Sequence, residues 1–211
     1  MTPVLWGRAT SVNVQKVMWA LGECDIAHER IDAGGRHGRT DTPEFRAMAP
    51  LGRVPVWQDG NLNLWESHAI LRHLGRGPAG ALWPDAPEAR ARVDQWMEFT
   101  TSTLLPPFIG VFYQVFRLPE RERSAEALAA QSAELNRALD ILEAELGRSD
   151  WLAGPDLTLA DICAGAPMYR YHTIDVVRTE RPALSKWYSR LTERAAYRQA
   201  VMTSYDDLRL P

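Results

Sequence analysis

The spacing of hydrophobic residues changes part-way along the chain, and the change divides the sequence. Up to about residue 75, short apolar or alternating runs indicate strands at residues 4–6 and 26–31 and in the segment 54–65. Apolar residues recur at i, i+3, i+4 and i+7 from Val14 to Leu21, which predicts an amphipathic helix. A short helix is expected from about Pro43 to Met48, because proline is favoured at the first helical position.

The segment 51–71, LGRVPVWQDGNLNLWESHAIL, indicates two strands followed by the start of a helix. Residues 54–57 are rich in β-branched and aromatic types, Asp59-Gly60 forms a tight turn, and residues 62–65 alternate apolar and polar. Ser67 is a good N-cap for the apolar run that follows it. The resulting order, β-α-β-α-β-β-α, predicts an α/β thioredoxin-like domain with a mixed four-stranded sheet.

Beyond residue 75 the strand pattern disappears. Residues 75–87, GRGPAGALWPDAP, are rich in glycine and proline and indicate a linker. Helices are expected over 88–105, then on to Phe116 after a break at Pro106-Pro107, over 124–146, from Thr158, at 184–191 and over 196–201. The predicted organisation is a thioredoxin-like domain (1–75), a linker (76–87) and an all-α helical domain (88–211).

The composition is that of an ordinary globular protein, with 45% hydrophobic and 24% charged residues among 211. The net charge is −3 and the 22 arginines are scattered, so no nucleic-acid partner is expected. There is no signal pattern and no long apolar stretch, which predicts a cytoplasmic protein without membrane contact. Cys24 and Cys163 have no metal-ligand spacing, which predicts buried free thiols and no metal site.

The segment 54–67 carries two features that suit a peptide-like ligand. Pro55 falls where a strand begins, and a cis Val54-Pro55 bond would turn the amide and carbonyl of Val54 outward. Ser67 begins a helix, and a helix N-terminus attracts carboxylates. Taken alone, each feature is also compatible with a purely structural role, since serine N-caps are common.

The order and spacing of Arg53-Val54-Pro55 and Glu66-Ser67 resemble the glutathione-binding half of the soluble glutathione S-transferases. The resemblance implies that Val54 pairs with the cysteinyl backbone of glutathione beside the cis-proline. It also implies that Glu66 and Ser67 hold the γ-glutamyl end. Thr158 and Asp161 resemble an N-capping element of the family's helical half, for which we expect a role in folding.

A glutathione thiol needs a donor to its sulfur, because its unperturbed pKa of about 8.5 leaves it protonated at neutral pH. In this family the donor is a Tyr, Ser or Cys after the first strand. The spacing Ser11-x-Asn13-x-x-Lys16-Val17 resembles the Ser or Thr types, the theta-like and nu-like bacterial enzymes. Ser11 is therefore the expected thiolate donor and Asn13 a second one. Thr10 remains a competing candidate for the thiolate donor. In the structural alternative, Ser11 is only the helix N-cap and Asn13 only a turn residue.

Arg53 is the residue expected at the glycyl carboxylate, since a guanidinium suits a carboxylate bidentately, and a solvated loop cation is its alternative. His37 and Arg39 lie in a Gly-rich loop that also reaches the glycyl end in related enzymes, but neither is predicted to bind the ligand. The resemblance also implies an electrophile site to which the helical domain contributes. The region of that domain expected there contains Thr100, Thr103, Phe108, Phe112, Tyr113 and Phe116.

The predicted function is therefore a glutathione transferase that conjugates glutathione, its co-substrate, to small hydrophobic electrophiles without a metal. A cytoplasmic homodimer is expected from the resemblance. Two alternatives stay open. One is a glutathione-dependent disulfide reductase or peroxidase of the nu-like type, favoured by Asn13. The other is a non-catalytic binding module of the same family, against which the retained residues 53–55 and 66–67 count.

Overall fold

The computed structural model describes residues 2–210 and divides into two compact units. The first comprises the described chain up to Pro84 together with Ala195–Thr203. The second comprises Asp85–Arg194 and the residues from Ser204 onward. The domain boundaries inferred from the sequence, at residues 75 and 88, stay a prediction.

The first unit is built on a four-stranded sheet with the order β2-β1-β3-β4. β1 and β2 are parallel, and the other two pairs are antiparallel, so the predicted mixed sheet is confirmed. Its elements are β1 (Val4–Trp6), α1 (Val12–Glu23), β2 (Glu29–Ile31), α2 (Pro43–Met48), β3 (Val56–Asp59), β4 (Leu62–Trp65), α3 (Ser67–Gly75) and α10 (Ala195–Ala200).

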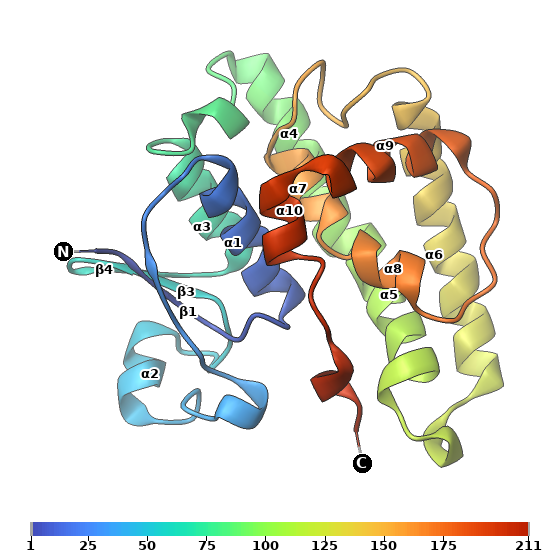
Figure 1. Cartoon of the computed structure of the whole chain (residues 1–211), viewed down its shortest axis with the longest axis horizontal. Helices are drawn as coiled ribbons and strands as arrows, with labels where there is room; N and C mark the ends of the chain where they lie inside the picture. Colours follow the sequence, from blue (N-terminus) through green and yellow to red (C-terminus); the bar gives the residue numbers. More distant parts are fainter. Residues whose placement is uncertain (1, 211) are drawn as a thin grey trace. The chain divides into compact units, whose positions relative to one another are not determined.

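Helices cover both faces of this sheet, with α1 and α3 on one face and α2 on the other (Figure 1). On the α2 face, buried Phe45 packs with Val56, and the Trp6 ring meets Phe45 edge to face at 6.3 Å. α10 lies against α1, where the Tyr197 and Trp19 rings are 4.7 Å apart (Figure 1). Both rings are fully buried, so α10 adds to the core beneath α1.

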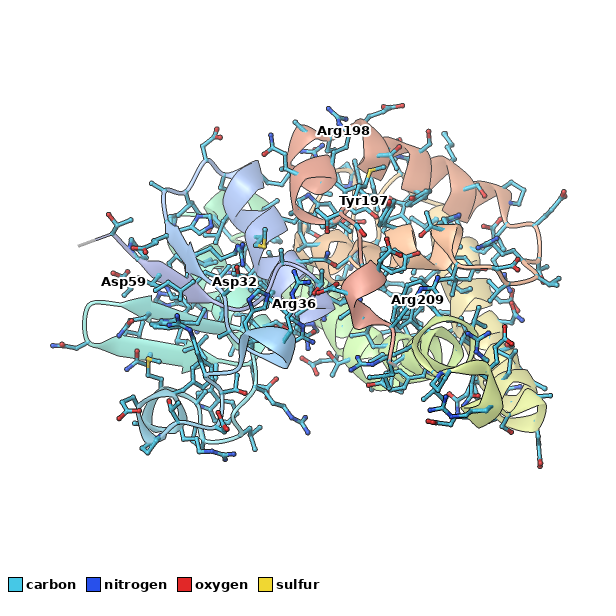
Figure 2. All side chains as sticks on the ribbon, turned by 60° about the horizontal axis from the view of Figure 1, so that its bottom comes forward. Asp32, Arg36, Asp59, Tyr197, Arg198 and Arg209 are labelled. Atoms are coloured by element: carbon cyan, nitrogen blue, oxygen red, sulfur yellow. The ribbon has the colours of Figure 1, made fainter. Side chains whose placement is uncertain are left out.

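The two ends of the sheet differ in what they carry. Asp59, in the β3–β4 hairpin, lies at one end, whereas Asp32 and Arg36 follow β2 at the other (Figure 2). Because β3 runs antiparallel to β1, its first residue, Val56, pairs with Trp6 at the end where β1 finishes. The loop before α1, the loop after β2 and the Val54-Pro55 bond are thereby brought to one end of the sheet.

The second unit is helical in its described residues, apart from an isolated bridge between Trp151 and Gly154. Its main elements are α4 (Pro87–Phe99), the π-helix η3 (Thr100–Leu104), α5 (Leu105–Phe112), the π-helix η4 (Tyr113–Arg117), α6 (Ala125–Leu146), α7 (Leu159–Gly165), α8 (Met168–Thr173) and α9 (Pro182–Glu193). Short 3-10 turns occur at Gly35–His37, Gly80–Leu82, Glu120–Glu122 and Asp206–Leu208. α8 has no counterpart among the helices predicted from the sequence.

The expected break at Pro106-Pro107 is wrong. Both prolines lie in the first turn of α5, and the π-helix η3 precedes them, so the backbone stays helical from α4 through η4. A proline removes a backbone donor, so a continuous helix tolerates it best where the i→i−4 hydrogen-bond pattern is already interrupted. The wider π turn supplies the register in which the prolines fall at harmless positions.

Candidate functional site

The starts of α1 and α3 and the segment before β3 surround one pocket in the first unit. The space in this pocket is about 400 Å³, part of which is open to solvent. The lining residues are Asn13, Ala49, Leu51, Arg53, Val54, Pro55, Trp65, Glu66 and Ser67. Six of the seven residues predicted for the site are in this set.

The Val54-Pro55 bond is cis, as predicted. Within the described chain, no hydrogen bond engages the amide or the carbonyl of Val54. Gly7, which has a φ of 152°, permits the close packing behind it. A Cβ at Gly7 would lie 2.4 Å from a Val14 methyl carbon and 3.2 Å from the Val54 Cβ. Val54 is thus held against the β1–α1 loop, and its unengaged amide and carbonyl can pair with a peptide.

At the start of α3 the structure corrects one prediction: the N-cap is Glu66, not Ser67. Glu66 has a φ of 69°, a left-handed conformation that is uncommon outside glycine, and its side chain makes no capping bond. Ser67 is the first helical residue, only 5% exposed, and its Oγ donates to Oδ1 of Asn13 at 3.4 Å. Strained residues of this kind cluster at binding sites, and both Glu66 and Ser67 line the pocket.

Ser11 is the N-cap of α1, as the structural alternative required, but its hydroxyl makes no capping hydrogen bond. Its side chain is half-buried and does not line the pocket, whereas Asn13 two residues later is exposed there. The first N–H groups of α1 point toward this end of the sheet, and a helix N-terminus favours an anion. The structure therefore brings together all the predicted residues except Ser11, which lies at the adjoining helix start.

Three lining residues were not predicted: Ala49, Leu51 and Trp65. Leu51 and Trp65 are 54% and 40% exposed, which is unusual for large apolar side chains at a concave surface. Their one sequence signal is position, because Trp65 directly precedes Glu66 and Leu51 lies two residues before Arg53. Arg53 is exposed and has no ion-pair partner within residues 2–210, so its guanidinium is available to a carboxylate.

Behind the pocket, buried Lys16 on α1 contacts buried His68 on α3, with 3.1 Å between Nζ and Nε2. Burial, followed by the positive charges of Lys16 and Arg72, lowers the pKa of His68 to about 3. His68 is therefore neutral near neutral pH.

Two features are absent from residues 2–210. No three His, Cys, Asp or Glu side chains gather there as metal ligands. No helix in that range has the length and apolar character to cross a membrane. Cys24 and Cys163 form no disulfide, as predicted, but the predicted burial holds for Cys163 only, because Cys24 is partly exposed.

A thioredoxin-like sheet with a cis-proline beside two open helix starts, followed in the chain by a helical unit, defines a class of proteins that bind glutathione. The chain matches family models for the N-terminal domain of glutathione S-transferase over residues 10–76 and for its C-terminal domain over residues 93–195. This chain belongs to the glutathione S-transferase family.

Individual relatives are similar to this chain over nearly its full length. Glutathione S-transferase GstB of Escherichia coli K12 is 37% identical over 94% of this chain and 97% of the relative. Glutathione S-transferase 4 of Zea mays is 32% identical over 91% of this chain and 88% of that relative. The theta-class glutathione S-transferase of Xanthomonas axonopodis pv. citri, solved with glutathione bound, has a TM-score of 0.93 at 41% identity, covering 96% of this chain and 98% of that one.

The predicted fold, family and activity are thereby confirmed. The protein is a transferase with glutathione as its co-substrate, and its activity is the general one of the family, conjugation of glutathione to electrophiles.

Proposed function

We propose that the pocket in the first unit binds glutathione in one defined orientation. The backbone of Val54 beside Pro55 pairs with the cysteinyl residue, Glu66 accepts from the γ-glutamyl amino group, and the backbone N–H of Ser67 donates to its carboxylate. Arg53 binds the glycyl carboxylate. The observation that carries the proposal is the convergence of these residues on one pocket, with the Val54 amide and carbonyl unengaged.

The thiolate is stabilised at the start of α1. Ser11 donates its hydroxyl to sulfur, which its uncommitted side chain permits, and Asn13 offers its side-chain amide N–H as a second donor. The Asn13 Oδ1 already accepts from Ser67, which leaves the amide nitrogen for the ligand. A hydroxyl donor and the positive end of α1 both favour the anion, so the bound thiol ionises below its usual pKa.

The remaining assignments extend this site. The electrophile is small and hydrophobic, and residues 88–211 contribute contacts to it. Residues 1–75 form the glutathione-binding domain, and residues 76–87 form the linker. The protein works as a homodimer in the cytoplasm. Sedimentation at micromolar concentration tests the dimer; a monomer there would refute that assignment.

Turnover of a model aryl halide tests the site. Ser11→Ala is expected to lower kcat by at least about tenfold, the usual size for a lost stabilising donor, while calorimetry still shows glutathione binding. Thr10→Ala tests the competing donor and should keep kcat within about twofold, because the proposal gives the Thr10 hydroxyl no contact with sulfur. Unchanged turnover in Ser11→Ala with a defect in Thr10→Ala would move the donor to Thr10.

The same preparations, assayed for reduction of a small disulfide, separate conjugation from the reductase alternative. Conjugation is expected to dominate. A preparation that gives no heat with glutathione would refute the binding site itself.

A further inference from the structure

The end of α1, the loop that leads to β2, and α10 line a second pocket in the first unit. The space in it is about 720 Å³, part of which is open to solvent, so it is larger than the pocket at the start of α1. Pockets of this size hold small organic molecules. The two pockets have no lining residue in common, so the second one is separate from the proposed glutathione site.

The apolar part of this second pocket belongs to a tight contact between two helices. Met18 and Leu21 of α1 and Ala200 of α10 line it. The two helices lie side by side (Figure 1), and a Cβ at Gly22 would be only 3.1 Å from the Ala196 Cβ. Small residues at the contact therefore let the helices approach closely. An apolar ligand can bury its surface against such a preformed wall at little cost in conformational entropy.

The polar side chains among the lining residues are those of Asp25, His28 and Gln199. Nδ1 of His28 is 2.9 Å from the Ile26 carbonyl oxygen, and Nδ1 carries the proton because a carbonyl can only accept. In the neutral ring Nε2 is then an acceptor, and it has no hydrogen-bond partner within residues 2–210. The Asp25 carboxylate is also an acceptor and has no ion-pair partner in the described chain. Both groups suit a ligand that donates hydrogen bonds.

The charges around this loop favour a cation. Residues 23–29, ECDIAHE, contain three carboxylates and no lysine or arginine, and no described lining residue is a lysine or an arginine. Burial, followed by the negative charges of Glu23 and Asp25, raises the pKa of the neighbouring Cys24 thiol. Arg198 of α10 is exposed and does not line the pocket. A negative potential of this kind attracts positively charged ligands.

We propose that the second pocket is a binding site for an organic ammonium compound with a small aromatic or aliphatic body. The body packs against Met18, Leu21 and Ala200, and the ammonium group donates to the Asp25 carboxylate and to Nε2 of His28. The site is additional to the transfer reaction and needs none of the residues proposed to bind glutathione.

The probe is 1-naphthylmethylamine, which is a flat apolar cation at neutral pH, titrated into the whole protein in the presence of saturating glutathione. Amide proton and nitrogen shifts of residues 18–28 and 196–200 are expected to move with a Kd of about 1–3 mM, the value for a ligand of about 12 non-hydrogen atoms. 1-Naphthylmethanol and 1-naphthoate have the same aromatic body without the positive charge. They should bind at least about fivefold more weakly.

Asp25→Asn tests the charge. Asp25 has a φ of 51°, a left-handed conformation that asparagine also adopts, so this variant keeps the loop. It should weaken binding of the amine by about fivefold and leave turnover of an aryl halide unchanged. Asp156→Asn is the matched control, because Asp156 is an exposed carboxylate of the second unit, and it should change neither. If Asp25→Asn does not fold, Asp25→Gly, which accepts a positive φ without strain, carries the same expectation.

Three results would overturn the second site. One is an affinity for 1-naphthoate equal to that for the amine, and another is an amine affinity that the Asp25 variants leave unchanged. The third is a set of shifts that lies wholly outside residues 18–28 and 196–200. Each of these results leaves the glutathione site standing, because calorimetry with glutathione alone tests that site.

Discussion

The start of α7 and the starts of α1 and α3 carry similar residues and use them in opposite ways. At α7, the Thr158 hydroxyl accepts from the Ala160 amide, and the Asp161 carboxylate accepts from the Thr158 amide. Asp161 also accepts from the Leu152 amide and the Trp187 Nε1, both at 3.0 Å. At α3, Glu66 and Ser67 make no capping bond, and the same holds for Ser11 at α1.

The difference shows how a polar helix start can be assigned to folding or to binding. The oxygens of Thr158 and Asp161 are fully committed to their own unit, where they join the 150s loop, α7 and α9. The groups at α1 and α3 leave backbone donors uncommitted, and the left-handed conformation of Glu66 costs the fold about 1–2 kcal/mol. Uncommitted donors around a pocket are what an anionic peptide needs.

The largest expected effect is at Asp161. Asp161→Asn replaces an acceptor by an amide whose NH2 faces N–H donors, and we expect a loss of about 3–5 kcal/mol in unfolding free energy. Urea unfolding measures it, with Asp156→Asn as the control because Asp156 is an exposed carboxylate of the same loop. A loss below about 1 kcal/mol would remove the contrast between the two kinds of helix start.

The dependence of stability on pH should also differ between the two units. The pKa of His68 falls from 6.5 in the unfolded chain to about 3 in the folded one, so the unfolded state binds more protons between these values. Its contribution is complete above pH 6.5 and is lost as the pH falls, by about 2 kcal/mol at pH 5. Unfolding of wild type and His68→Gln at pH 5 and 7 measures it, and parallel curves would contradict it.

The contribution of Asp161 to stability changes with pH in the opposite direction. Burial raises its pKa from 3.8 to about 6 against the lowering effect of its hydrogen bonds, so the folded state binds more protons between these values. Its contribution is therefore greatest below pH 4 and declines as the pH rises through 6, by about 3 kcal/mol in all. The difference in unfolding free energy between wild type and Asp156→Asn should stay constant over this pH range.

A smaller effect is expected for ligand affinity at α3. Ser67→Ala removes the hydroxyl that donates to Oδ1 of Asn13 and so links two residues of the pocket, and we expect the Kd for glutathione to rise about tenfold, or about 1.4 kcal/mol. Calorimetry measures it. Ser124→Ala is the matched control, because Ser124 is the capping serine of α6 and its loss should cost about 1 kcal/mol of stability and leave the Kd unchanged. Equal affinity in both variants would exclude Ser67 from the site.

The sequence alone predicts most of the fold because its local signals agree with one another. Pro43 begins α2, Ser124 caps α6, and Thr158 with Asp161 forms the predicted capping box. The helix across Pro106-Pro107 was not predictable, since a π turn is a non-local compromise that no residue pattern encodes.

At the site, Arg53 to Pro55 and Glu66 to Ser67 were found through their resemblance to a family and not through periodicity. The cap at Glu66 was missed because residue preferences favour Ser67 there. Trp65 and Leu51 were missed because an apolar residue beside a binding motif has the same pattern as a core residue. Lys16 and His68 are 52 residues apart, so their contact is visible only once α1 and α3 are packed together.

The most direct measurement is turnover and melting temperature on the same two variants, Ser11→Ala and Thr158→Ala. Ser11→Ala should lower aryl halide turnover at least about tenfold and leave the melting temperature within about 1 °C. Thr158→Ala should lower the melting temperature by about 2–6 °C and leave kcat and KM unchanged. If Ser11→Ala instead melts early and turns over normally, the start of α1 serves the fold and our account of the site is contradicted.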